Sequence, residues 1–185
     1  MMRSLIARVG GVALGAAALM LGVSACTEPT DATVAGGDLE EIAADNVIFG
    51  MVMFMSTNGV RQGHVEADTA YLFSDSSTAK LHQMRIVFYD DNGNEKATVT
   101  GTSGEWDQDS GRMTAWGDVL LEVHTDGRTI ESSELNYDPQ RDMVWSDSAT
   151  VQTLANGTVT RGSAFESDMD FQNVRISNIR GAIGR

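Results

Sequence analysis

The residues that could do chemistry in this chain begin with its single cysteine, Cys26. A lone thiol serves as a small buried hydrophobe, as a nucleophile or as a point of covalent attachment. Cys26 stands where the apolar run VGGVALGAAALMLGV, residues 9–23, gives way to polar residues. A core cysteine would have strand or helix pattern on both sides, and a nucleophile would need a histidine placed beside it by the fold. The position of Cys26 therefore favours covalent attachment.

The other candidates for metal chemistry are dispersed along the chain. His64, His82 and His124 lack the close spacing of zinc ligands. The segment DDNGNE, residues 90–95, suggests a calcium loop, but its glycine stands fourth where such a loop needs it sixth, and no glutamate stands twelfth. A solvated hairpin turn accounts for this segment better. We therefore expect no metal and no cofactor.

Catalysis would have to rely on carboxylates such as the pair Asp107 and Asp109, because paired carboxyl groups can hydrolyse glycosides. Acidic residues occur in every turn, however, so nothing marks this pair as special. The sequence has no nucleophile elbow and no phosphate loop. Trp106, Trp116 and Trp145 could stack sugars, although tryptophans in strands are more often core or rim residues. We expect no enzyme, and no residue is assigned a catalytic role.

The segment that precedes Cys26 has the order of a secretory signal. Arg3 and Arg8 come first without any acidic residue, and the apolar run follows. This run is shorter and less apolar than the about 20 residues that a membrane-spanning helix needs. The tetrapeptide VSAC, with Leu21 just upstream, resembles the bacterial lipobox, whose cysteine is acylated and becomes the new N-terminus. We therefore expect residues 1–25 to be a lipoprotein signal peptide and Cys26 to be the lipid attachment site.

The charge of the remaining chain excludes some partners. Cleavage before Cys26 would leave 160 residues and remove two arginines, which takes the formal net charge from −13 to −15. Such a chain is repelled by nucleic acid and by anionic headgroups, so we expect no nucleic-acid partner. With one cysteine it cannot form an internal disulfide, and its core alone must stabilise it. Residues 26–45, rich in Thr, Asp, Ala, Gly and Glu, are predicted to be a tether.

From Asn46 onward, apolar and polar residues alternate in short runs. This period of two predicts half-buried strands. Turn signals recur between the runs; they are Asn58-Gly59, Asn92-Gly93, Ser110-Gly111, Asp126-Gly127, Asp138-Pro139 and Asn156-Gly157. Their regular spacing predicts a meander of antiparallel strands. We expect residues 46–180 to form one all-β domain.

The strand pattern is also repeated. Four similar segments begin with a β-branched residue, reach an aromatic residue six or seven positions later and then continue into a second apolar strand; they start at Val65, Val99, Ile130 and Val159. Stacked repeats of this kind bury a continuous core that one unit could not bury alone. An odd spacing in two of the units predicts a bulge or kink near Gly104 and another near Glu134, because one extra residue reverses the two faces of a strand.

Several of these segments resemble the LptC family, the periplasmic component of the lipopolysaccharide export bridge. The segments are GHVEADTAY, AWGDVLLEVHTDG, MVWSDSATV and VTRGSAFESDMDFQNVRI, and the resemblance covers residues 47–176. It implies a single open β-jellyroll of curled antiparallel sheets. It also implies that the protein takes lipopolysaccharide from an inner-membrane ABC transporter and passes it to LptA. Known members have an N-terminal transmembrane helix, which a lipobox would replace here.

A curled sheet could shelter acyl chains on an apolar inner face. The residues expected to line this lipid-binding groove are Ile86, Phe88, Val119, Leu121, Val123, Leu135, Val151 and Phe171. Met51, Met53 and Met55 fall on one strand face, where soft packing and ligand contact are equally open. An open sheet also has two unpaired edges. LptA is expected at the C-terminal edge, at Asn173, Val174, Arg175 and Ile176, and the transporter at the N-terminal edge, residues 49–55.

The alternative to a carrier is an envelope scaffold that binds partners through its sheet edges and holds no lipid. Both interpretations place the protein in the cell envelope of a Gram-negative-type bacterium. The lipid anchor would attach it to the periplasmic face of the inner membrane, and the sequence leaves the outer membrane open as the other location.

Overall fold

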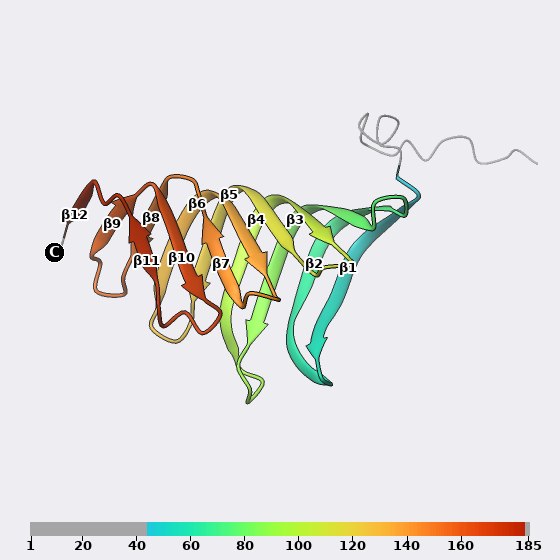
Figure 1. The fold of residues 1–185 in the computed structure, drawn as a ribbon, viewed down its shortest axis with the longest axis horizontal. Helices are drawn as coiled ribbons and strands as arrows, with labels where there is room; N and C mark the ends of the chain where they lie inside the picture. Colours follow the sequence, from blue (N-terminus) through green and yellow to red (C-terminus); the bar gives the residue numbers. More distant parts are fainter. Residues whose placement is uncertain (1–43, 184–185) are drawn as a thin grey trace, which may run out of the picture. The chain divides into compact units, whose positions relative to one another are not determined.

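The computed structural model describes residues 44–183, which form an antiparallel sheet of twelve strands (Figure 1). The strands are β1 (Asn46–Thr57), β2 (Val60–Phe73), β3 (Thr78–Tyr89), β4 (Glu95–Asp107), β5 (Met113–Val123), β6 (Arg128–Asp138), β7 (Met143–Ser146), β8 (Thr150–Thr153), β9 (Val159–Gly162), β10 (Ala164–Asp168), β11 (Arg175–Ser177) and β12 (Gly181–Ile183). The predicted all-β class is confirmed. The predicted signal peptide, Cys26 and most of the tether lie outside the described residues.

No helix within residues 44–183 is long and apolar enough to cross a membrane. The strands are joined by the tight turns that the sequence predicts. In the β1–β2 turn, Asn58 and Gly59 have φ values of 52° and 81°, which is the left-handed pair that a two-residue hairpin turn requires. Asparagine and glycine adopt this conformation at the lowest cost, so the turn fixes the register of the first hairpin.

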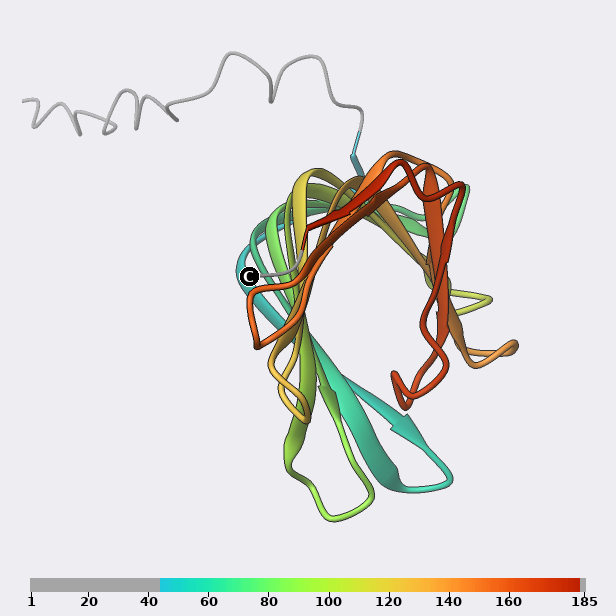
Figure 2. The ribbon, with the colours of Figure 1, turned by 90° about the vertical axis from the view of Figure 1, so that its left-hand side faces the viewer.

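The sheet divides into two branches at β6. The second half of β6 pairs with β7, and β10 and β11 continue that branch. The first half of β6 pairs with β8, and β9 and β12 continue the other branch. Figure 2 looks along the row of strands and shows the sheet curled around a central axis. Each long strand therefore contributes one half to each of two facing layers.

The long strands bend along a line where regular pairing is interrupted. Met51 pairs with Ala67 and Phe49 with Thr69, while Gly50, at φ 61°, has no partner between them. The same interruption crosses β3 at Gln83, which also has a positive φ. The register shifts between residues 100 and 103 in the β4–β5 pair and between 116 and 119 in the β5–β6 pair. Irregularities are thus present close to Gly104 and Glu134, as predicted, but the extra residue belongs to β5, which has three residues facing two of β4 and two residues facing one of β6.

The interruption reverses side-chain direction, so both halves of a strand point apolar residues into the curl. Ala67 and Ala70 in β2 are three residues apart, yet both are buried. The two layers meet across the core, where the rings of Phe88 and Tyr137 lie with centroids 5.2 Å apart at 60°. This edge-to-face contact links β3 in one layer to the second half of β6 in the other.

Candidate functional site

The candidate site is the inner face of the curled sheet, which we call the trough. Seven of the eight residues predicted for the groove lie together in one buried apolar cluster, each at most 2% exposed; they are Ile86, Phe88, Val119, Leu121, Val123, Leu135 and Phe171. The alternation of each strand brings them to this face, and the bend keeps them there along its whole length. The middle of the trough is therefore filled by the protein's own side chains.

Val151 is the exception, and its predicted place in the groove is wrong. Val151 pairs with Glu131, and the next residue of β8 pairs with the buried Ile130. Directly paired residues in an antiparallel sheet point to the same face. Val151 therefore lies with Glu131 on the outer face, where it is half-buried. A depression of about 640 Å³ there is lined by residues that include Val151, Leu120 and Glu131.

Open space occurs where the trough meets solvent, which we call the mouth. Two cavities of about 260 and 270 Å³ share four lining residues, namely Thr57, Gln62, Tyr137 and Pro139. Thr57 and Gln62 flank the β1–β2 turn, and Pro139 follows β6 in the facing layer. The mouth is thus formed by strand ends from both layers. Figure 2 shows the β1–β2 and β3–β4 ends projecting beyond the other strands.

The methionines of β1 supply part of this mouth. Met51 is buried, whereas Met53 and Met55 are half-buried, pack against the core and line the first cavity. Trp106 and Met113 line the same cavity from β4 and β5. Thioethers are flexible and polarisable, so they can adjust to guests of different shape. The methionine stripe is therefore both core packing and cavity lining.

The other two tryptophans point away from the trough. Trp116 is 37% exposed and pairs with Glu134. Trp145 pairs with Glu166, and the guanidinium of Arg141 lies 5.3 Å from its ring centroid. Both tryptophans are on the outer face, where neither can contact a guest inside the curl.

The connection between β10 and β11 closes the trough from one side. Met169 and Phe171 in this segment are 5% and 2% exposed and join the core, and Met169 lines the second cavity. Between them, Asp170 is exposed and forms an ion pair with Lys96 of the opposite layer, at 3.4 Å. The segment thus crosses from one layer toward the other at the mouth. No local pattern in the sequence predicts this contact, because its two partners are 74 positions apart.

The sheet edges differ in character. β1 is a twelve-residue edge strand with large exposed apolar side chains, including Phe49 at 68%, Val52 at 55% and Phe54 at 54%. At the other end, β11 is the last strand of its branch and contains Arg175 and Ile176 of the predicted partner edge. Asn173 and Val174, the other two predicted residues, lie in the connection before β11. The side chain of Asn173 is tied there by a hydrogen bond to Asp168.

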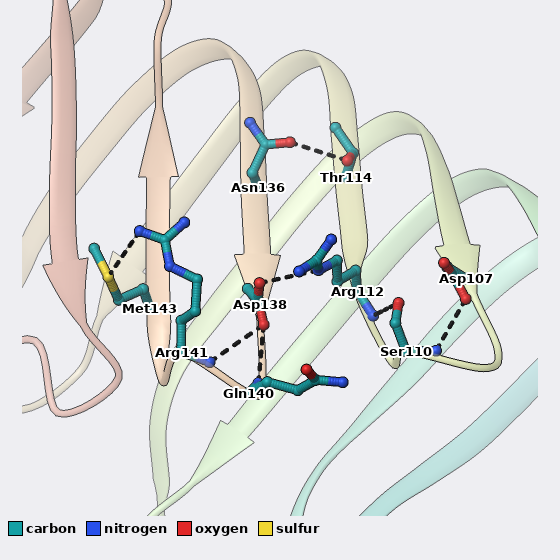
Figure 3. A network of polar contacts seen from close by, with 9 residues as sticks. All are labelled: Asp107, Ser110, Arg112, Thr114, Asn136, Asp138, Gln140, Arg141 and Met143. Carbon is teal, nitrogen blue, oxygen red and sulfur yellow. Dashed lines mark hydrogen bonds and ion pairs between the residues drawn. The ribbon is translucent and has the colours of Figure 1, made fainter.

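Aspartates build the turns between the strands, as Figure 3 shows for two of them. The Asp107 carboxylate accepts the backbone N–H groups of Asp109 and Ser110. The hydrogen bond from Ser110 is the main reason that the pKa of Asp107 is lowered. The pair Asp107 and Asp109 therefore has a structural explanation, because the first carboxylate holds the turn that contains the second.

Asp138 repeats this arrangement in the β6–β7 turn (Figure 3). Burial alone would raise its pKa, but the backbone N–H groups of Gln140 and Arg141 and the guanidinium of Arg112 outweigh burial and lower it. The Arg112 Nε atom donates to the Asp138 carboxylate at 2.9 Å. Because the pKa of Asp138 is lowered in the folded state, its carboxylate stabilises the fold at pH values above the ordinary pKa of 3.8. This contribution to stability is lost as the pH falls through the lowered pKa.

The three histidines are not brought together. His64 bonds Tyr89 through Nδ1 at 2.8 Å, His124 bonds Thr98 at 2.9 Å, and His82 is exposed on β3. Within the described part of the chain, no group of three or more His, Cys, Asp or Glu side chains is placed to hold a metal ion.

Comparison with known proteins agrees with this architecture. The family model described as "Lipopolysaccharide-assembly, LptC-related" matches residues 15–183. Among solved structures, the chain is similar to LptH, the LptA-homologous periplasmic component of the lipopolysaccharide transport device of Pseudomonas aeruginosa. That match has a TM-score of 0.50 and 16% identity, and it covers 65% of this chain and 89% of LptH, so it shows a shared fold. No curated protein matches the chain. Since the family model spans most of its length, the chain belongs to the LptC-related family of lipopolysaccharide-assembly proteins.

Proposed function

We propose that this protein is a carrier in the periplasmic bridge that exports lipopolysaccharide. It accepts the lipid from an inner-membrane ABC transporter and passes it to an LptA-type protein. The observation that carries the proposal is the trough, an apolar interior in an open curled sheet whose mouth holds two cavities lined by Met53, Met55, Trp106 and Tyr137. The family membership supplies the lipid class.

The energetics of an acyl chain explain why such a trough is needed. A chain of a dozen methylenes gains about 8 to 10 kcal/mol on leaving water, at about 0.8 kcal/mol per methylene. The lipid therefore cannot cross an aqueous compartment unaided. Contacts with aliphatic and thioether side chains have no fixed direction, so neighbouring positions along the trough can hold a chain with similar free energy. This property allows release as well as binding.

The packed middle of the trough defines where loading begins. Leu121 and Ile86 are at most 1% exposed, so an incoming acyl chain cannot contact them first, whereas Met55 and Trp106 line an open cavity. An acyl chain would first enter the mouth and then replace contacts between the two layers. The two layers are continuous only through the bend, so they can part at the mouth without breaking strand pairs within either layer.

The two sheet edges provide the connections of a bridge. We propose that β11 adds a strand from the LptA-type partner and that β1 meets the transporter, because unpaired edges offer free backbone groups for strand addition. The exposed apolar face of β1 at Phe49, Val52 and Phe54 supports a protein contact there. The same feature is what favours the scaffold alternative, in which the edges bind partners and the trough holds no lipid.

Residues 1–25 are proposed to be a cleaved signal peptide and Cys26 an acylated N-terminus that anchors the domain, through the tether, to the periplasmic face of the inner membrane. Intact mass spectrometry of the protein purified from membranes is expected to give the mass of a chain that begins at Cys26 with acyl chains added. A chain that keeps Met1, or one cleaved with a free thiol at Cys26, would remove this part of the proposal.

Photo-crosslinking at two positions of one strand separates the carrier from the scaffold. A photoreactive residue in place of Met55, which lines the mouth, is expected to capture lipopolysaccharide in living cells. The same residue in place of Val52, 55% exposed on the other face of β1, is the matched control and is expected to capture none. Equal capture at both positions, or none at Met55 in a protein that supports export, would favour the scaffold.

A further inference from the structure

Lys96 occupies an unusual position for a lysine. Its side chain is only 15% exposed, although lysine is among the residues least often buried. Phe88 pairs with Ala97 and Tyr89 with Glu95, so Lys96 is an extra residue without a partner in β3. A bulge of this kind redirects a side chain out of the regular alternation. The bulge aims Lys96 at the mouth of the trough.

The side chain of Lys96 borders one of the two mouth cavities. It lines the second mouth cavity together with Phe88, Tyr137 and Met169, and all three belong to the apolar cluster. The cavity thus has an apolar wall on one side, and the Lys96 ammonium and the Asp142 carboxylate both lie at its border. Of these two charged groups, the Lys96 ammonium is the one that can attract an anionic headgroup whose acyl chain contacts the apolar wall.

The present counter-ion of Lys96 is weakly held. Asp170 is 72% exposed, its carboxylate lies 3.4 Å from Nζ, and it belongs to the β10–β11 connection of the other layer. A largely solvated carboxylate contributes little to such a pair, whereas the poorly solvated ammonium needs a negative partner. An anion of higher charge that enters the cavity can therefore replace Asp170.

We propose that Lys96 is the anion-recognition residue of the trough, and that its ammonium leaves Asp170 to bind a phosphate group of the lipid whose acyl chain enters the mouth. This inference rests on the proposed carrier function and adds to it the side chain that recognises the phosphate of the lipid. Lysine binds phosphate as a point charge. A chain with a formal net charge of −13 otherwise repels such a ligand, so a local cation at the entry point is needed to offset that repulsion.

Equilibrium binding of two probes to the full chain tests this role. The probes are lipid A with its phosphates and the same lipid A after enzymatic removal of the phosphates. Lys96→Gln is expected to weaken binding of the phosphorylated probe about tenfold, the loss of one charge-assisted hydrogen bond, and to leave binding of the dephosphorylated probe unchanged. Lys80→Gln is the matched control, because it removes the chain's only other lysine from an exposed position and should change neither affinity.

Asp170→Asn distinguishes phosphate recognition by Lys96 from a purely structural role, in which the ion pair between Lys96 and Asp170 only holds the mouth closed. If Lys96 recognises phosphate, loss of the competing carboxylate should strengthen binding of the phosphorylated probe severalfold. If the ion pair only holds the mouth closed, Lys96→Gln and Asp170→Asn will act alike on both probes, and the assignment of Lys96 is overturned while the carrier function stands. A wild-type protein that binds neither probe would instead overturn the carrier function. Circular dichroism of each variant checks that it is folded.

Discussion

Replacing Leu121 by aspartate should unfold the domain, whereas the same replacement at Val151 should leave it folded. The sequence places both residues in the groove, but Leu121 is fully buried among apolar side chains of β5 and its neighbours. An unpaired carboxyl group at that position costs several kcal/mol, a large part of the about 5 to 15 kcal/mol that stabilises a typical domain. Val151 lies on the outer face between Glu131 and Arg161. One neighbour repels the new carboxylate and the other attracts it, so the net cost there should stay within about 1 kcal/mol.

Urea denaturation of the full chain, followed by far-UV circular dichroism, measures both effects. The Leu121→Asp variant is expected to lack a cooperative transition, while Val151→Asp keeps a midpoint close to that of the wild type. Equal destabilisation by the two substitutions would mean that Val151 faces the core. A loss of lipopolysaccharide export in Leu121→Asp would therefore report unfolding, so lipid contacts are better tested at half-buried mouth residues such as Met55.

The fold could be predicted from the sequence because its signals are local. Alternation, two-residue turns and a degenerate repeat each depend on neighbouring residues, and the strands and turns that they predict are found in the structure. Even the irregularities near Gly104 and Glu134 can be recognised in the sequence, because one extra residue in a repeat reverses the side-chain alternation. Seven of the eight predicted groove residues reach the inner face for the same reason.

Val151 was misplaced because its face depends on pairing between distant residues. β8 pairs with only the first half of β6, at the point where the sheet divides, and the register of that pairing decides which side chains turn inward. A four-residue strand carries too few alternations to reveal its inner face by pattern alone. The ion pair between Lys96 and Asp170 could not be predicted for a related reason, since only the curl of the sheet brings the two layers together at the mouth.

Gly162→Ala should strongly weaken binding of the LptA-type partner at the C-terminal edge. A Cβ atom at Gly162 would overlap Cγ2 of Ile176 and would lie 2.5 Å from the carbonyl oxygen of Ser177. The isoleucine side chain can rotate away, but the carbonyl belongs to the backbone of β11 and accepts a hydrogen bond from the N–H of Ser163. The added methyl group must therefore displace β11, which contains Arg175 and Ile176 of the proposed partner edge.

The expected loss is at least tenfold in affinity for the purified partner, because strand addition requires the backbone groups of the edge to lie in one line. Stability should fall by only about 1 to 3 kcal/mol, since β11 is three residues long and contributes only the partly buried Ile176 to the apolar cluster. Gly181→Ala is the matched control: it adds the same methyl group to the neighbouring edge strand β12, where no atom lies within 4 Å of the new Cβ. Partner binding that survives Gly162→Ala unchanged, or that is lost equally with Gly181→Ala, would show that β11 is not the docking edge. Because the trough residues are untouched by either change, capture of lipopolysaccharide at Met55 should persist in Gly162→Ala, which separates loading of the carrier from transfer to its partner.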